Sequence, residues 1–331
     1  MTIRPRREYI SSIFILVTVA CAYGIIVSVE IFKIGCDEMS KKMNKYAGDQ
    51  PAAYDPTGMS QYLGLGRPID FDKKLNKVAM MAAIFISVAV TLWKCSTGMD
   101  SGDAVVSALG YALGFLFSFI VAQELDPDRQ LGGIIGGVLT VIAYYFIGEG
   151  NILVMLWLLF ILRMLNRSSG DRHRLLDNVI MIGSAAWLGR EGYWVYPLLT
   201  GAAYILESQI QAGYFRSLYL AGISLACLIF AKYGAIENTL SMSNIILMAV
   251  AFILFLPEIR CADFVKAKGD KNGLRLLPKR LQTMQGYFLM MLFTLTFMHG
   301  DAAVVSLAPA VAAAMGCGVM LFVALVKHEV Y

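Results

Sequence analysis

Residues 131–165 read LGGIIGGVLTVIAYYFIGEGNILVMLWLLFILRML. They contain two apolar runs, 131–147 and 151–165, joined by the short turn Gly148-Glu149-Gly150. A hydrocarbon core about 30 Å thick is crossed by roughly 20 apolar residues in a helix, which satisfies its own backbone hydrogen bonds there. This stretch therefore predicts a helical hairpin inside a membrane.

Similar apolar runs recur along the whole chain of 331 residues. Only 16% of the residues are charged, whereas an ordinary soluble domain carries about 25%. The runs are 9–34, 76–94, 104–123, 131–147, 151–165, 178–189, 193–207, 217–233, 244–259, 285–299 and 302–326. We expect an all-α, polytopic integral membrane bundle with about ten or eleven membrane segments in consecutive short-looped hairpins. One membrane domain would then span residues 1–331, in the bilayer of the plasma (cytoplasmic) membrane.

Alternate turns differ in charge. One set is basic and includes the two longest polar loops, 36–75 and 261–284, so the positive-inside rule places this set in the cytoplasm. Because the cations flank the membrane segments, we do not expect nucleic acid as a partner. The other set places a glycine beside a carboxylate: Gly102-Asp103, Gly148-Glu149, Gly189-Arg190-Glu191, Gly234-Ala235-Ile236-Glu237 and Gly300-Asp301.

This recurring glycine and acid pattern predicts internal repeats, which are common in membrane transporters. The alternative explanation is that glycine ends one helix and an acid favours the start of the next. Glycines also recur four residues apart inside the run 131–147, as Gly132-Gly133 and Gly136-Gly137. That spacing predicts close helix packing.

A transport or binding route is the first functional hypothesis. Ionisable residues within or beside membrane segments usually face the bundle interior or a cavity. Glu149, Arg190, Glu191 and Glu237 are the predicted substrate-binding residues, and the Gly-Glu-Gly and Gly-Arg-Glu-Gly breaks would provide discontinuous helices. The protein would bind or move a small or lipidic molecule. A structural subunit that contacts other membrane proteins is a further alternative.

A membrane-embedded enzyme is the second hypothesis. Three carboxylates, Glu124, Asp126 and Asp128, lie in the basic-face turn that ends with Arg129, and Asp177 follows a later turn rich in arginine. Carboxylate oxygens suit Mg²⁺ and arginines suit phosphate, so these turns could bind a lipid-linked phosphate or diphosphate with Mg²⁺. The arrangement resembles that of prenyltransferases only loosely, because the longer Asn-Asp-x-x-Asp type motifs are missing. The alternative is a pair of solvated turns whose charges balance each other.

The segment Gly98-Met99-Asp100-Ser101-Gly102-Asp103 resembles the GxGD motif of prepilin peptidases, which are membrane aspartyl proteases. The resemblance implies that Asp103 is one of two aspartates that activate water. It covers a short part of the chain, and Asp100 stands where the motif has a glycine. Asp301 could be the second aspartate only in an arrangement that this family does not use.

Overall fold

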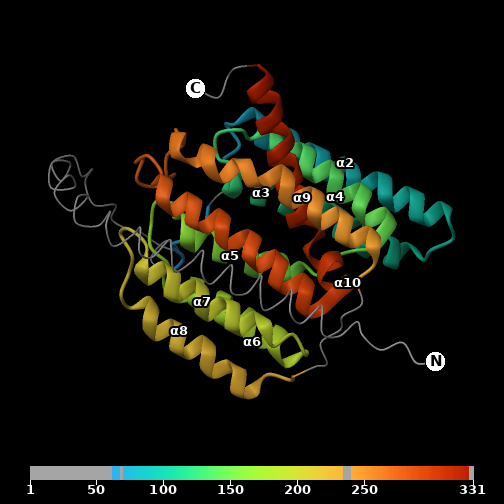
Figure 1. Cartoon of the computed structure of the whole chain (residues 1–331). Coiled ribbons are helices and arrows are strands. Elements are labelled where there is room, and N and C mark those ends of the chain that lie inside the picture. Colours follow the sequence, from blue (N-terminus) through green and yellow to red (C-terminus); the bar gives the residue numbers. More distant parts are fainter. Residues whose placement is uncertain (1–61, 68–69, 234–239, 328–331) are drawn as a thin grey trace, which may run out of the picture. The chain divides into compact units, whose positions relative to one another are not determined.

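The computed structural model describes residues 62–67, 70–233 and 240–327 (Figure 1). The chain divides into two compact units, Met1–Asp55 and Pro56–Tyr331, and every described residue belongs to the second. The expected helix 9–34, much of the loop 36–75 and Glu237 lie outside the described residues. A single domain over 1–331 stays a prediction.

The described part is an all-α membrane bundle, as predicted. Among the residues that the structure describes, four helices are long and apolar enough to cross a membrane: α2, α3, α9 with its short extension, and α10. The elements are α2 (Lys74–Ser96), α3 (Ser101–Leu125), α4 (Leu131–Ile147), α5 (Ile152–Asn166), α6 (Leu175–Arg190), α7 (Val195–Gln209), α8 (Ser217–Ala226), the 3-10 helix η2 (Cys227–Phe230), α9 (Met242–Cys261), the 3-10 helix η3 (Ala262–Phe264) and α10 (Pro278–Val326).

The predicted apolar runs agree closely with these helices, but several helices are shorter than a full span. The run 131–147 matches α4, and 151–165 is displaced by one residue from α5. Both helices are apolar but fall below the length of a simple crossing, as does the segment Ser217–Phe230. The internal repeat stays a prediction.

The helix α10 turns back on itself at Gly300. A straight helix of its 49 residues would be about 73 Å long. Instead Gly300 has φ 59° and ψ −141°, outside the helical region. We call the parts of α10 before and after Gly300 its first and second arms. Both arms contact the end of α3: Gln285 Nε2 in the first arm donates to the Leu125 carbonyl at 2.7 Å, and Cys317 Sγ in the second donates to the Ala122 carbonyl at 3.6 Å. The sequence correctly predicted two runs separated by this turn.

The glycines of α4 allow close packing against the second arm of α10. A Cβ at Gly316 would lie 2.2 Å from the carbonyl oxygen of Gly132, and one at Gly136 would lie 2.9 Å from the Cα of Ala313. Backbone therefore approaches backbone at these positions, which only glycine permits. The predicted close packing is confirmed.

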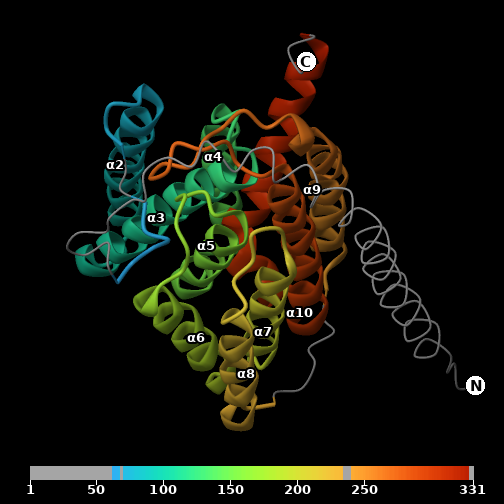
Figure 2. The same cartoon turned by 90° about the vertical axis from the view of Figure 1, so that its left-hand side faces the viewer.

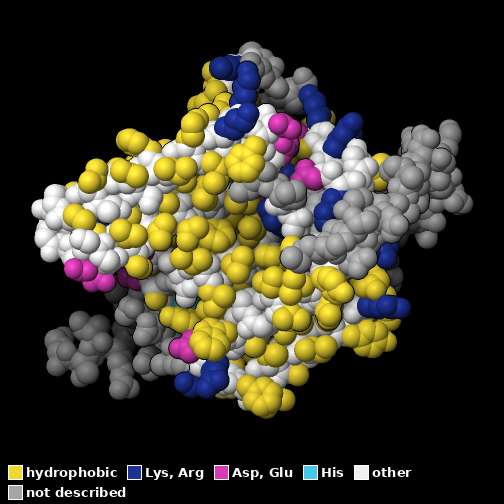
Figure 3. All heavy atoms as spheres, turned by 180° about the vertical axis from the view of Figure 1, so that it is seen from behind, with side chains coloured by type: hydrophobic (Ala, Val, Ile, Leu, Met, Phe, Trp, Pro, Cys, Tyr) yellow, Lys and Arg dark blue, Asp and Glu magenta, His cyan; other side chains and the backbone are white. Residues whose placement is uncertain are grey.

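The helix α5 lies in the middle of the bundle and contacts α3, α6, α7 and α10 (Figure 2). Trp157 on α5 is fully buried, and its Nε1 donates to the hydroxyl of Thr200 on α7 at 2.8 Å. The outer helices instead expose large apolar side chains, such as Phe85, Phe146 and Ile229. Figure 3 shows hydrophobic side chains over much of one face, which is the surface expected toward lipid.

Candidate functional site

A cavity of about 330 Å³ lies where the α3–α4 turn, the end of α9 and both arms of α10 meet. We call this the basic end of the bundle, because three loops of net positive charge, 167–174, 210–216 and 262–277, lie there. Its lining includes the charged residues Asp126, Asp128, Arg129, Glu258 and Lys266, together with Cys261. Leu281 from one arm of α10 and Ala324 from the other form part of its apolar wall.

The α3–α4 turn is set by its own sequence. Pro127 disfavours helical backbone in the preceding residue, and Asp126 has φ −136° and ψ 88° where α3 ends. The Asp126 carboxylate then accepts the N–H groups of Asp128 and Arg129, both at 3.2 Å. Asp128 fixes the neighbouring loop, because its carboxylate accepts the N–H groups of Lys266 and Ala267 at 2.9 and 2.8 Å.

Two buried carboxylates share one guanidinium in this cavity. Arg129 Nε lies 2.7 Å from Asp126 Oδ2, and Arg129 Nη2 lies 2.5 Å from Glu258 Oε1. Asp126 and Glu258 are each only 2% exposed. Oε2 of Glu258 has no hydrogen-bond partner among the described residues. A buried carboxylate oxygen without a donor is costly, so this atom can accept a hydrogen bond from a ligand.

The cavity lining has three carboxylates, those of Asp126, Asp128 and Glu258, and two cations, Arg129 and Lys266. Burial raises the pKa of the Asp126 carboxyl, and the charge of Arg129 opposes that rise. Burial alone lowers the pKa of Arg129, but the charges of Asp126 and Glu258 outweigh it, so that pKa is raised. The carboxyl ends of α3, α9 and α10 lie at this end and carry partial negative charge, and the amino ends of α4 and α10, which carry partial positive charge, lie there as well.

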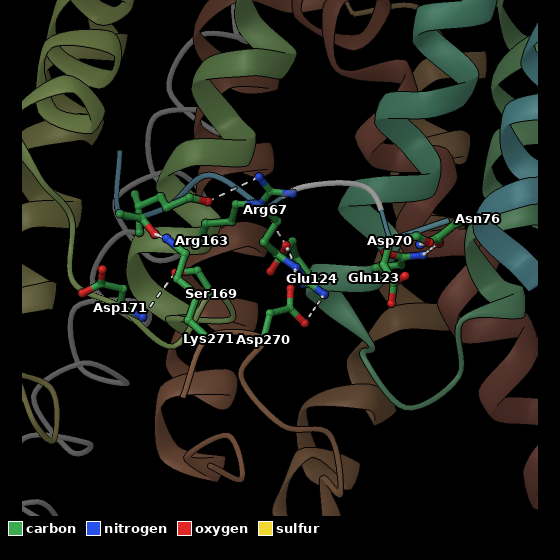
Figure 4. A network of polar contacts seen from close by, with 12 residues as sticks. Arg67, Asp70, Asn76, Gln123, Glu124, Arg163, Ser169, Asp171, Asp270 and Lys271 are labelled. Carbon is green, nitrogen blue, oxygen red and sulfur yellow. Dashed lines mark hydrogen bonds and ion pairs between the residues drawn. The ribbon is translucent and has the colours of Figure 1, made fainter. Parts of the chain in front are cut away.

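A second group of charges fixes the loop before α2. Glu124, fully buried at the end of α3, accepts from Arg163 Nε at 3.0 Å and from Arg67 Nη1 at 3.3 Å. Arg67 also donates to Asp270 from Nη2 at 3.1 Å, and Figure 4 shows these side chains together. Burial alone would lower the pKa of Arg67, but the charges of Glu124 and Asp270 outweigh it and raise that pKa, so the Arg67 guanidinium stays charged.

Asp177 has the same role from α6. Its Oδ2 accepts the N–H of Gly64 at 2.7 Å and that of Arg174 at 2.8 Å, and Leu65 N lies 3.2 Å from it. The end of α3 and the start of α6 therefore both contact the segment 64–67. The contact is made by backbone amides and Arg67, and both carboxylates position a loop.

The predicted metal ligands Glu124, Asp126 and Asp128 are all bound by protein groups. Within the described ranges, no group of three or more His, Cys, Asp or Glu side chains could hold a metal ion. The Mg²⁺ site thus gains no support from the geometry. The catalytic prediction for Asp103 also gains none: Asp103 is exposed in the first turn of α3, and Asp301 accepts hydrogen bonds from Ser241 and Asn244.

Of the predicted substrate-binding residues, the three that the structure describes do not line this cavity. Glu149 lies at the opposite end of the bundle, where its Oε1 is 3.3 Å from Lys94 Nζ. Arg190 and Glu191 are exposed at the end of α6. Glu207, also an ionisable residue of an apolar run, is fully buried and pairs with Arg167 and Arg280.

Glu258 is the residue that sequence reasoning missed. It stands beside Pro257 at the end of the run 244–259, and an ionisable residue in an apolar run was itself a signal. Its partner Arg129 is 129 residues away, which no local pattern reveals.

Comparison of the chain with protein-family models, with curated proteins and with solved structures finds no match.

Proposed function

We propose that this multi-pass membrane protein binds a small organic cation, an amine, in the cavity at its basic end and carries it into or across the membrane. The observation that supports this most directly is the buried pair Asp126 and Glu258, which shares Arg129 and leaves Glu258 Oε2 without a hydrogen bond among the described residues. An ammonium group would donate to that oxygen and bring the missing positive charge.

The size and lining of the cavity suit such a molecule. Its volume of about 330 Å³ is near the lower end of the range of about 300 to 1,000 Å³ for small-molecule pockets. Leu281, Ala324 and Phe264 would contact an alkyl portion, whereas the carboxylates would contact the amine. An anion would instead meet three carboxylates against two cations, and Arg129 is already paired with two of those carboxylates.

Movement of the bound molecule has a basis in α9. Pro257 stands inside this helix, directly before Glu258. Proline has no N–H, so the carbonyl of Ile253 lacks its usual helical partner and the last turn of α9 is less firmly joined to the rest. A hinge there would carry Glu258 and its ligand together.

Calorimetric titration of the purified protein at neutral pH tests the binding. We expect n-butylammonium to bind and butyrate, its matched anion, not to bind. E258Q should weaken butylammonium binding by about tenfold or more, because a charge-assisted hydrogen bond contributes about 1.5–3 kcal/mol. E191Q is the matched control, because Glu191 is exposed and distant from the cavity, and it should leave the affinity unchanged.

Equal binding of butylammonium and butyrate, or unchanged affinity in a folded E258Q protein, would contradict the proposal. Transport is tested separately with proteoliposomes, in which internal unlabelled butylammonium should accelerate the entry of labelled butylammonium. Protein-free liposomes give the passive rate of the neutral amine. Binding without this exchange would limit the function to binding.

A further inference from the structure

Two arginines stack on one tyrosine at the edge of the basic end, away from the cavity. The guanidinium carbon of Arg172 lies 5.2 Å from the ring centroid of Tyr214, and that of Arg216 lies 6.0 Å from it. Both arginines are exposed. In the described part of the chain neither makes an ion pair, and the nearest acid in sequence, Asp171, pairs with Arg174 at 2.7 Å. Asp171 also accepts the backbone N–H of Arg172 at 2.7 Å, but neither guanidinium group of the two stacked arginines is paired with a carboxylate in the described residues.

The backbone adds to this positive potential. Arg216 directly precedes α8, which has no acidic residue in its first turn. The start of α6 lies beside it, because Nε2 of His173 is 2.9 Å from the hydroxyl of Ser217. Helix amino ends carry partial positive charge and favour phosphate groups. Asp177 offsets the partial positive charge at the start of α6, so the two arginines and the amino end of α8 are the groups that attract a phosphate here.

Exposed apolar side chains surround the two arginines. Leu175 is 70% exposed, and Phe215 and Tyr219 are each 69% exposed, with the two rings in edge-to-face contact. Tyrosine concentrates at the level of lipid headgroups, and Tyr219 is such a residue. An anion that binds here therefore lies beside a surface for hydrocarbon chains.

We propose that Arg172 and Arg216 form a binding site for the phosphate of an anionic membrane lipid. Arginine is the side chain best suited to phosphate, and the rings of Tyr214, Phe215 and Tyr219 would lie along the glycerol and upper chains. The source is a lipid because a free phosphate would make no use of the apolar surroundings. This site shares no residue with the cavity, so it stands or falls independently of the amine proposal.

Native mass spectrometry of the full-length protein in detergent tests the site, with dimyristoyl phosphatidylglycerol and dimyristoyl phosphatidylcholine as probes. We expect phosphatidylglycerol to bind about tenfold more tightly than phosphatidylcholine. The double variant R172Q/R216Q should abolish that difference. The matched control K268Q/K279Q removes two exposed charges from the same end of the bundle and should change the ratio by less than about twofold.

Three results would overturn the proposal. If both double variants lost the preference for phosphatidylglycerol to the same extent, the lipid would be attracted by all cations at this end and not by a defined site. Displacement of phosphatidylglycerol by millimolar inorganic phosphate, down to the level of phosphatidylcholine, would identify a site for free phosphate. An unchanged ratio of phosphatidylglycerol to phosphatidylcholine affinity in R172Q/R216Q would show that these arginines do not bind the lipid phosphate. Thermal unfolding of each variant confirms that the comparison is made between folded proteins.

Discussion

His173 is a buried imidazole in a loop of the basic end. Burial, aided by the positive charges of Arg167 and Arg280, lowers the pKa of His173 to about 4. In the unfolded chain the same group titrates near pH 6.5, so the unfolded state binds more protons between these two values. The stability that depends on neutral His173 is therefore complete above about pH 6.5 and is lost as the pH falls toward 4.

We predict that His173→Gln flattens the pH dependence of stability. Wild-type protein should lose up to about 3 kcal/mol between pH 7 and pH 4 from this group, in addition to what its carboxylates lose. The measurement is the melting temperature of detergent-solubilised protein over that range. The carboxylates are common to both proteins, so a wild-type slope in the variant would show that His173 does not titrate as stated.

For single residues, the sequence showed which charged side chains belong to the polar turns, but it did not show which groups they bind. The sequence placed four carboxylates in two acid-rich turns: Glu124, Asp126, Asp128 and Asp177. Glu124 and Asp177 contact the segment 64–67, and Asp126 and Asp128 line the cavity. Their contacts could not be predicted, because Arg67, Glu258 and the amides of Gly64 and Leu65 reach them only through the tertiary fold.

The contact between α4 and the second arm of α10 depends on the absence of side chains. We predict that Gly316→Ala destabilises the protein by about 1–3 kcal/mol, because the added methyl group would meet the Gly132 carbonyl. Gly286→Ala is the matched control on the same helix, where a Cβ meets nothing within 4 Å. It should be neutral or raise stability by up to about 1 kcal/mol.

Chemical denaturation monitored by tryptophan fluorescence measures both changes, and Trp157 provides a buried reporter on α5. Equal effects of the two substitutions would mean that helix propensity, rather than the close approach of the backbones, decides the result. A destabilised Gly286→Ala protein with an unaffected Gly316→Ala protein would contradict the packing outright.

Helices were the most predictable level of structure. Hydropathy and glycine turns located α4 and α5 within one residue and separated the arms of α10 at Gly300. The predicted bounds of the loop 261–284 were less accurate, because η3 occupies its start and α10 already begins at Pro278. Short-range backbone contacts, such as the bridge between Lys268 and Arg275, leave no periodic pattern in the sequence.

For the whole molecule, we predict that cysteines at the two ends of the bundle face opposite sides of the membrane. Cys95 is exposed at the end of α2, beside the acidic turns, whereas Cys261 lines the cavity at the basic end. The positive-inside rule places the basic end in the cytoplasm. Single-cysteine variants in intact cells should therefore react with a membrane-impermeant maleimide at Cys95, and at Cys261 only after permeabilisation.

Reaction of both cysteines from the same side would contradict this topology, and the reverse pattern would invert it. Because the positions of the two cysteines depend on how all the helices cross the membrane, the labelling tests the topology of the whole bundle. The location of the cavity could not be predicted from the sequence, because its walls come from α3, α9 and both arms of α10.

The reversal of α10 also has a consequence for the order of synthesis. The chain leaves the ribosome from its amino end, so Ala324 is the last of the cavity-lining residues to be made. Until the second arm has inserted and packed on Gly132 and Gly136, Asp126 and Glu258 lack the helix that encloses them. A nascent chain stalled at Gly300 would carry both carboxylates and no closed cavity.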